Sequence, residues 1–260
     1  MTQKKTYEAK RKFFNGLFRK SETMKRLGKL YEGKAKILYK TEDPTLMIQY
    51  FKDDASAFDG VKKGTIVDKG VINNQVSSRI FQYLEENGVK THFVKHLSDR
   101  EMLVKKLDII PVEVVLRNVG AGSLCKRLGV REGTEFEVPI LEFFYKNDDL
   151  HDPLINDCHA ITFGWATKEE LQVLRSSGYR VNELMEKFFK ERKIRLVDFK
   201  LEFGRHEGEI LLGDEISPDG CRLWHWDTGE KMDKDRFRFS MGSVEEKYQE
   251  VYNLVCSDLG

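Results

Sequence analysis

The segment of residues 197–204, VDFKLEFG, constrains the fold of this chain more than any other eight residues. Its apolar and charged side chains alternate, which is typical of a strand with one face in a core. The other face carries Asp198, Lys200 and Glu202. A polar turn over residues 204–209 and an apolar run over residues 210–212 complete the pattern of a β-hairpin. The chain therefore must contain antiparallel sheet at this point.

The predicted hairpin also brings several charged side chains close together. Pairing of its two strands brings Asp214 toward the start of the first strand, beside Asp198, Lys200 and Glu202. Carboxylate oxygens bind Mg²⁺ and a lysine neutralises phosphate, so this cluster suits a metal ion that holds a nucleoside triphosphate. Without a metal ion, neighbouring acids are expected to repel one another. A solvated outer face of an antiparallel sheet explains the same residues, and this segment alone leaves both interpretations open.

Composition narrows the class of protein. A chain of 260 residues with 40% hydrophobic and 33% charged residues can form one large domain or two domains in contact. Its apolar runs are all too short to span a membrane, so we expect no membrane partner and a cytoplasmic location. The four cysteines lack CxxC spacing and the six histidines are scattered, which favours reduced thiols over disulfides or a zinc site.

The first 29 residues differ from the rest of the chain. They hold ten Lys or Arg against two acids, a balance of +8, whereas the remainder has a balance of −7. A basic arm of this kind could contact nucleic acid or an acidic membrane, or act as a targeting peptide. Its lysine-rich composition and lack of an apolar run disfavour a targeting role. We expect a solvated extension with a short helix that uses Phe13, Phe14, Leu17 and Phe18.

The remaining patterns predict the α+β class, because antiparallel strands come first and helices gather later. Expected strands cover residues 30–32, 37–39, 45–51, 91–97, 102–107, 112–117, 134–145 and 221–226, besides the hairpin. Expected helices cover residues 68–88, 124–128, 167–178, 181–193 and a C-terminal segment, with Asp68, Thr167 and Ser243 as N-caps. We expect a basic extension (1–27), an antiparallel-sheet nucleotide-binding domain (28–108) and an α+β domain with the metal and substrate site (109–260).

Three further segments have a functional and an ordinary interpretation. Residues 33–36, GKAK, resemble a phosphate-binding flap, but a basic surface turn fits equally well. Residues 117–123 place an arginine, a glycine-rich turn and Ser123 together, which suits an anion pocket or a plain strand-to-helix turn capped by Ser123. Residues 233–238, DKDRFR, are either a solvated loop or, with Arg222, the positive side of a substrate site.

Taken together, these motifs resemble the phosphoribosylaminoimidazole-succinocarboxamide synthase (SAICAR synthetase) family. The resemblance runs in order and at matching spacing over about residues 28–255, and only the N-terminal arm lies outside it. The matching segments are residues 30–36, 98–99, 103–106, 111–118, 121–124, 146–148, 162–165, 197–204, 213–220 and 233–238.

The resemblance implies a fold in which an N-terminal antiparallel sheet and a larger α+β portion clasp ATP, distantly like protein kinases and ATP-grasp enzymes. It implies that ATP, carboxyaminoimidazole ribonucleotide (CAIR) and L-aspartate give SAICAR, ADP and phosphate in de novo purine biosynthesis. Phosphorylation turns the CAIR carboxylate into an acyl phosphate, which the aspartate amine then attacks. ATP is thus a co-substrate, Mg²⁺ the implied cofactor, and a homodimer the expected assembly.

The resemblance also implies roles for individual residues. Lys200, Asp198 and Arg117 match the catalytic centre, and Glu202 and Asp214 match the metal ligands. The residues that match the ATP site, including a hinge-like segment beside the adenine, are Lys34, Ala35, Lys36, Lys105, Leu107, Ile109 and Lys146. Those that match the ribonucleotide site are Asp59, Arg117, Ser123, Asp198, Arg222, Lys234 and Arg238. Phe58 departs from the family pattern, which often has a small residue there.

Two other classes of protein share part of the pattern. An inositol-polyphosphate-type kinase of related fold also has an Asp-x-Lys strand, as in residues 198–200. Such a kinase does not require the turn at residues 117–123 or the segment at residues 233–238. A nucleic-acid-binding module would suit the basic arm, but the acidic body disfavours a continuous basic groove, so no nucleic-acid partner is expected.

Overall fold

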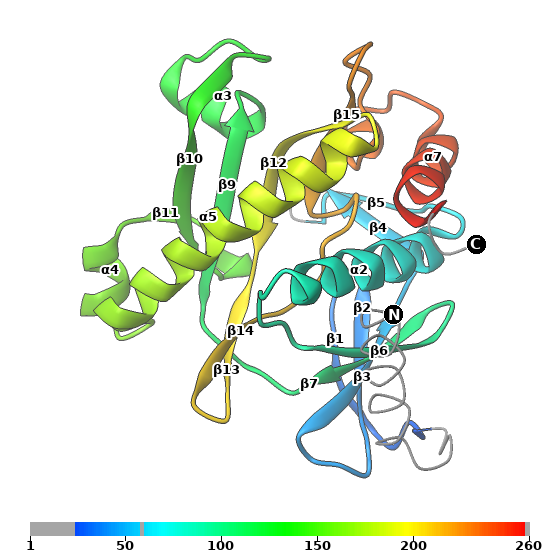
Figure 1. The fold of residues 1–260 in the computed structure, drawn as a ribbon, viewed down its shortest axis with the longest axis vertical. Coiled ribbons are helices and arrows are strands. Elements are labelled where there is room, and N and C mark those ends of the chain that lie inside the picture. Colours follow the sequence, from blue (N-terminus) through cyan, green and yellow to red (C-terminus); the bar gives the residue numbers. More distant parts are fainter. Residues whose placement is uncertain (1–23, 58–59, 258–260) are drawn as a thin grey trace, which may run out of the picture.

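The computed structural model describes residues 24–57 and 60–257. Its first layer is a five-stranded antiparallel sheet that begins with the predicted strands around residues 33–36 (Figure 1). Helix α2 (Lys69–Glu86) packs on this sheet through an apolar stripe that includes Ile72, Val76 and Ile80. The strands in spatial order are β1 (Lys29–Glu32), β2 (Lys36–Lys40), β3 (Leu46–Phe51), β7 (Glu101–Lys105) and β6 (Phe93–Ser98).

A second five-stranded antiparallel sheet contains the strand that carries Asp198 and Lys200. The long helix α5 (Lys168–Glu191) crosses one face of it (Figure 1). The strands in spatial order are β11 (Leu154–Ile155), β10 (Glu135–Tyr145), β9 (Val112–Val119), β12 (Ile194–Leu201) and β15 (Cys221–His225).

A small sheet joins the two large ones. It contains β14 (Glu209–Leu212), β13 (Phe203–His206) and β8 (Asp108–Ile109), and β8 lies in the segment that connects the first large sheet to the second. One continuous core includes residues of both large sheets and both long helices, so the proposed boundary between residues 108 and 109 stays a prediction. The remaining elements are β4 (Asp54–Ala57), β5 (Lys62–Thr65), α3 (Gly122–Leu128), η1 (Asp148–Leu150), α4 (Asp157–Thr162), α6 (Asp235–Arg238) and α7 (Val244–Cys256).

The alternating segment 197–203 is two strands rather than one. Its apolar side chains are buried as predicted, but the ladder breaks at Glu202, because β12 pairs with β9 and β13 pairs with β14 and β8. The opposite face is not solvated: Asp198 is 3% exposed and Glu202 is 5% exposed. The interpretation of these charges as an ordinary outer face is therefore wrong.

The two helices predicted on either side of Gly178 are one continuous helix, α5. Its capping box is confirmed, since Thr167 and Glu170 exchange side-chain-to-backbone hydrogen bonds of 3.2 and 2.8 Å. Gly178 does not end the helix but lets it approach the sheet closely. A Cβ atom at this position would lie 3.2–3.3 Å from side-chain carbons of Leu116, Val114 and Leu141.

Other predicted caps are wrong. Asp68 and Ser243 precede α2 and α7 in left-handed backbone conformations, and neither side chain caps its helix. The Gly70 N–H at the start of α2 donates instead to Asp53. Ser123 lies inside α3, after the N-cap residue Ala121, so it does not cap that helix. The predicted arm helix and Asp59 lie outside the described residues.

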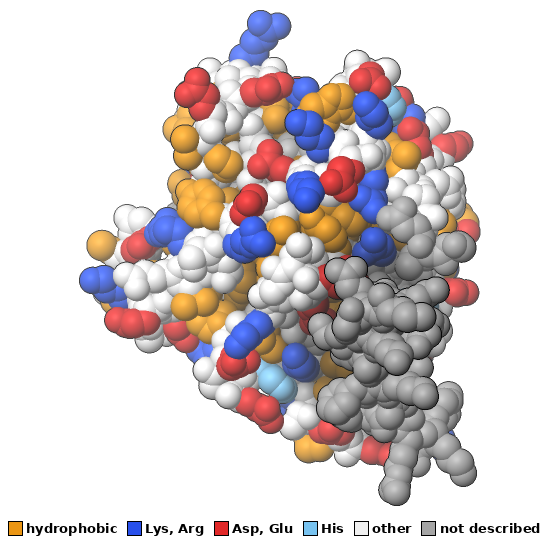
Figure 2. Space-filling view, in the orientation of Figure 1, with side chains coloured by type: hydrophobic (Ala, Val, Ile, Leu, Met, Phe, Trp, Pro, Cys, Tyr) orange, Lys and Arg blue, Asp and Glu red, His pale blue; other side chains and the backbone are white. Residues whose placement is uncertain are grey.

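Two features of the surface bear on possible partners. Within residues 24–57 and 60–257, no helix is both long and apolar enough to cross a membrane. Figure 2 shows Lys and Arg interspersed with Asp and Glu over the face that α5 covers. The described part of that face therefore carries charges of both signs.

Candidate active site

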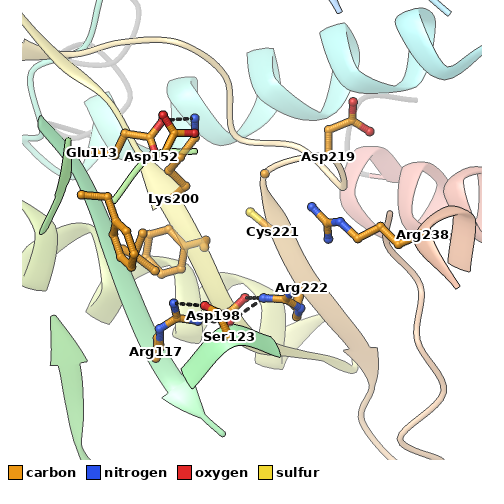
Figure 3. A pocket seen from close by; sticks show the side chains of 14 residues that line it. Glu113, Arg117, Ser123, Asp152, Asp198, Lys200, Asp219, Cys221, Arg222 and Arg238 are labelled. Atoms are coloured by element: carbon orange, nitrogen blue, oxygen red, sulfur yellow. Dashed lines mark hydrogen bonds and ion pairs between the residues drawn. The ribbon is translucent and has the colours of Figure 1, made fainter. Parts of the chain in front are cut away.

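A pocket of about 280 Å³ lies on the face of the second sheet opposite α5 (Figure 3). The alternation of β9 creates this division, because Val114 and Leu116 pack under α5 whereas Glu113 and Arg117 line the pocket. The residues that line it are Glu113, Val115, Arg117, Ser123, Phe144, Asp152, Asp198, Phe199, Lys200, Asp219, Gly220, Cys221, Arg222 and Arg238.

One end of the pocket is built around the buried carboxylate of Asp198. It accepts hydrogen bonds from Arg117 Nη1 at 2.8 Å and from Arg222 Nη1 at 2.8 and 3.0 Å (Figure 3). Arg117 also donates to Ser123 at 3.3 Å. Burial opposes the charge on Arg222, but the carboxylates of Asp198 and Asp235 raise the pKa of this guanidinium. The structure thus brings together four residues predicted for the ribonucleotide site.

The opposite end alternates acids and lysines. Lys200 Nζ lies 2.6 Å from Glu113 Oε1 and 2.8 Å from Glu202 Oε1, and Lys146 Nζ lies 2.9 Å from the same Glu202 oxygen. Burial alone would lower the pKa of Lys200, but Glu202 and Glu113 raise it well above its ordinary value. Burial raises the pKa of Glu113, and Lys200 opposes that shift. Lys200 is therefore held as a cation, which suits it to anchor an anion.

The acid cluster predicted for the hairpin is divided between these two ends. Pairing of β13 and β14 ends at Phe203 and Leu212, and the Gly213 N–H donates to the Glu202 carbonyl at 2.8 Å. Asp214 therefore lies near Glu202 and Lys200, whereas Asp198 belongs to the arginine end. The prediction that Asp214 joins all three residues at the start of the strand is wrong, because β12 and β13 belong to different sheets.

The GKAK segment contributes its second lysine to the acid and lysine end. Lys36 pairs with Asp214, 178 positions later, and with Glu215 at 3.3 Å. Burial disfavours the charged form of both side chains. Each charge nevertheless stabilises the other, so the pKa of Lys36 is raised and that of Asp214 is lowered. Lys34 instead reaches the exposed Asp148 at 2.8 Å, and Ala35 accepts a backbone hydrogen bond from Lys52.

The hinge-like residues Lys105, Leu107 and Ile109 lie in the connection between the two large sheets. Leu107 packs so tightly on Gly204 and Gly213 that a Cβ atom at those glycines would lie 2.7 and 2.6 Å from it. Ile109 pairs with Gly204 and is 38% exposed, and Lys105 Nζ lies 3.4 Å from the Thr91 carbonyl oxygen. These three residues do not line the pocket of Figure 3.

The segment 233–238 is not a solvated loop. Asp233 is fully buried and Asp235 is 2% exposed. Asp235 accepts hydrogen bonds from Arg222 at 2.9 Å and Arg238 at 2.6 Å, and it thereby orients two of the predicted substrate residues. Lys234 lies 3.7 Å from Asp219.

Sequence reasoning missed several charged residues at this site. Glu113 was detectable, since it shares the predicted strand face of Val115 and Arg117. Glu215 and Asp219 lie in the family-like segment 213–220, but no role was predicted for them. The others gave no local signal, because they come from a distant helix, another strand and a loop; they are Lys69, Glu142 and Asp152.

Comparison with known proteins assigns the chain to a family. The family model described as SAICAR synthetase matches residues 29–255. The chain belongs to the SAICAR synthetase family. The predicted family, the α+β fold and the assignment as an ATP-using ligase of purine biosynthesis are therefore confirmed. The alternative of an inositol-polyphosphate-type kinase is not supported.

Individual relatives agree with this membership. The phosphoribosylaminoimidazole-succinocarboxamide synthase of Chlorobium phaeobacteroides is 61% identical over 226 residues, which are 87% of this chain and 96% of the relative. The crystal structure of the Ehrlichia chaffeensis synthase has a TM-score of 0.86 at 45% identity and covers 88% of this chain and 98% of its own. A SAICAR synthetase in complex with ADP has a TM-score of 0.85 at 47% identity, and the match covers 87% of this chain and 97% of that structure's chain.

Proposed function

We propose that this chain joins L-aspartate to the carboxylate of CAIR at the expense of ATP, with the chemistry in the pocket of Figure 3. One observation carries the proposal: a single pocket is lined by arginines at one end and by Glu113 and Lys200 at the other, where Lys200 also contacts Glu202. A reaction between a phosphorylated ribonucleotide and ATP needs both kinds of end in one cavity.

The arginine end suits the ribonucleotide. A planar guanidinium grips phosphate or carboxylate through two parallel hydrogen bonds, and Arg117 and Arg222 are held in fixed orientations by Asp198. Ser123 and Arg238 add a hydroxyl and a third guanidinium at the same wall. We propose that these residues hold CAIR with its carboxylate directed toward Lys200. Asp59 keeps its predicted place in this site as a proposal.

The acid and lysine end suits the triphosphate. We propose that Lys34, Lys36 and Lys146 bind phosphate oxygens and that residues 105–109 lie along the adenine. Lys200, which lines the pocket between Glu113 and Glu202, would hold the γ-phosphoryl group near the CAIR carboxylate. The contacts of these lysines with acids fix their positions, and positioning with charge neutralisation supplies most of the catalysis in phosphoryl transfer.

Glu202 and Asp214 are the proposed ligands of Mg²⁺. The donor set fits, because both side chains offer hard carboxylate oxygens and the Gly213–Glu202 backbone hydrogen bond brings the two segments together. Within the described residues no group of three or more His, Cys, Asp or Glu could hold a metal ion. Mg²⁺ commonly uses one or two carboxylates together with substrate phosphates, so two are sufficient. When bound, the ion would offset the negative charge of the phosphates.

The proposed reaction balances as two substitutions. An oxygen of the CAIR carboxylate attacks the γ-phosphorus, the bond to the β,γ-bridging oxygen breaks, and ADP leaves with the electron pair. The aspartate amine nitrogen then attacks the acyl carbon, the carbon–oxygen bond to phosphate breaks, and the ammonium proton passes to solvent. The pocket residues position both steps and bind the leaving phosphate.

The experiment measures ADP and SAICAR formation together. In the steady state the purified protein should release ADP only when CAIR and L-aspartate are both present, in a 1:1 ratio with SAICAR identified by mass. Continued ADP release over many turnovers without aspartate, or ADP release that follows addition of an inositol polyphosphate, would contradict the proposal. Glu202→Gln should abolish turnover, whereas Glu209→Gln, an exposed change on the same hairpin, should not.

Homodimeric assembly and a cytoplasmic location also remain proposals. Two-fold dimers are the commonest soluble assemblies, and phosphorylated substrates do not cross membranes unaided. Sedimentation equilibrium of the full chain tests the first, and cell fractionation tests the second.

A further inference from the structure

Lys69, the first residue of α2, lies next to the substrate pocket without lining it. Its side chain is fully buried, and its ammonium group lies 2.8 Å from Oδ2 of Asp219. The other oxygen, Oδ1, accepts a hydrogen bond of 2.7 Å from the hydroxyl of Tyr248 on α7. Figure 3 shows the Asp219 carboxylate beside the pocket, directed away from Lys200. Two helices thus each send one buried polar group to the same carboxylate.

This arrangement is not explained by stability. Removing a lysine and a carboxylate from water costs several kcal/mol per ion, and well-packed apolar residues are often as stable or more stable in such places. Burial opposes ionisation of Asp219, but Lys234 and Lys69 hold its pKa below the ordinary range. Asp219 is therefore an anion throughout the neutral pH range, and it needs a cation beside it.

A second lysine competes for that anion. Lys234, a proposed ribonucleotide ligand, lies 3.7 Å from Asp219 Oδ2, beyond hydrogen-bond distance, and its side chain is 15% exposed. Lys69 lies almost 1 Å closer to the same oxygen. Burial lowers the pKa of Lys234; the Asp219 carboxylate opposes this shift, and the positive charges of Arg238 and Lys69 add to it. Each oxygen of Asp219 thus has one close donor, Lys69 on Oδ2 and Tyr248 on Oδ1, and Lys234 is the more distant cation.

We propose that Lys69 is a positioning residue that neutralises Asp219 and so leaves the ammonium group of Lys234 available for an anionic group of the ribonucleotide. This inference rests on the proposed function. Without Lys69, Asp219 would hold the nearest remaining cation, Lys234, in a direct ion pair. The substrate would then have to break that pair before it could bind, and ribonucleotide affinity would fall while ATP, bound at the other end, would be little affected.

The test compares Lys69→Met with the charge-balanced double variant Lys69→Met/Asp219→Asn. We expect the single variant to raise the KM for CAIR about tenfold or more, while the KM for ATP stays within about twofold. In the double variant the competing carboxylate is gone, so the KM for CAIR should return to within about threefold of the wild-type value.

A purely structural role for Lys69 predicts no selectivity between the two substrates, because loss of a buried partner would disturb the whole site. Lys69→Met would then lower kcat or raise the KM for ATP as much as it raises the KM for CAIR, and that result would overturn the inference. An unchanged KM for CAIR in Lys69→Met would overturn it as well.

Two controls keep the test decisive. If Lys69→Met does not fold, the double variant alone decides, because a CAIR KM near the wild-type value supports the inference and a strongly raised value contradicts it. Tyr248→Phe removes the other donor to Asp219 without changing charge, so it should alter the CAIR KM by less than about threefold. Failure of the wild-type protein to form SAICAR would instead contradict the proposed function, which separates the two ideas.

Discussion

Arg117 and Asp198 are cross-strand partners on β9 and β12, and their side chains are joined by a hydrogen bond of 2.8 Å between Nη1 and Oδ2. Both are buried, and Arg117 also donates to Glu142 through Nε at 2.7 Å. A guanidinium clamped at two atoms cannot rotate, so its remaining donors face the pocket in a fixed direction. This rigidity is the physical basis for expecting Arg117 to recognise an anion by shape as well as by charge.

The substitution Arg117→Lys should therefore impair ribonucleotide binding much more than ATP binding. Lysine keeps the charge but loses the planar fork, and it cannot reach Glu142, Asp198 and Ser123 together. The KM for CAIR at saturating ATP and aspartate should rise by about tenfold or more, with the KM for ATP nearly unchanged. Equal increases in both constants would place Arg117 outside the ribonucleotide site.

The substitution Asp214→Asn should slow phosphoryl transfer. It removes one charge from the proposed metal site and keeps the shape, so single-turnover ADP formation should fall by about 10²-fold, which is roughly 3 kcal/mol of transition-state stabilisation. The measurement is a Mg²⁺ titration of ADP formation in a single turnover. A near-normal rate at low Mg²⁺ would show that Asp214 is only a structural turn residue.

For the stability of the same variant, the structure leads to a different prediction from the sequence alone. Repulsion among neighbouring acids would make Asp214→Asn neutral or stabilising. In the structure Asp214 pairs with Lys36, and the lysines hold its pKa down against the effect of burial. Loss of this partly buried pair should lower the free energy of unfolding by about 1–3 kcal/mol without metal, as measured by denaturant titration. An increase in the free energy of unfolding would contradict a stabilising role of the Lys36–Asp214 pair.

His92 should make stability depend on pH. It is 4% exposed, and burial followed by the charges of Lys36 and Lys105 lowers its pKa to about 3. The unfolded chain, with a histidine pKa of about 6.5, binds more protons below that pH, so stability falls as the pH decreases from about 6.5 toward 3. From pH 7 to pH 5 this histidine should cost about 2 kcal/mol.

The comparison that isolates His92 uses His92→Gln. Its free energy of unfolding should decrease less between pH 7 and pH 5 than that of the wild type, by about 2 kcal/mol. His151→Gln, on the surface, should follow the wild type. Parallel curves for His92→Gln and the wild type would mean that His92 is protonated in the folded state.

Deletion of residues 1–24 should leave the catalytic constants within about threefold, a change below 1 kcal/mol. The deletion keeps Arg26, which pairs with Glu101 and lies over the rings of Tyr39 and Tyr50. The family match begins at residue 29, after the deleted segment. A large fall in turnover of a folded truncated protein would show that the arm contributes to the site.

Local sequence patterns determined the elements of this protein and which face of each strand is apolar. The apolar positions of residues 197–203 and the Thr167 capping box depend on neighbours within a few positions; the former are buried and the latter is present in the structure. Patterns failed where a distant surface overrode the local preference. Gly178 continues a helix because the sheet beneath it needs a residue without a Cβ atom, and Asp53 replaces Asp68 at the start of α2.

The electrostatics of the site were decided only by the tertiary structure. The sequence pattern places Asp198 and Glu202 on one strand face. Because of the break between β12 and β13, Asp198 contacts two arginines whereas Glu202 contacts two lysines. Lys36 meets Asp214 across 178 positions, and Lys69 meets Asp219 across 150. Sequence periodicity states which way a side chain points, but not which strand lies beside it. Since a buried charge depends on the partner within a few ångströms, its role follows from the pairing of segments far apart in the chain.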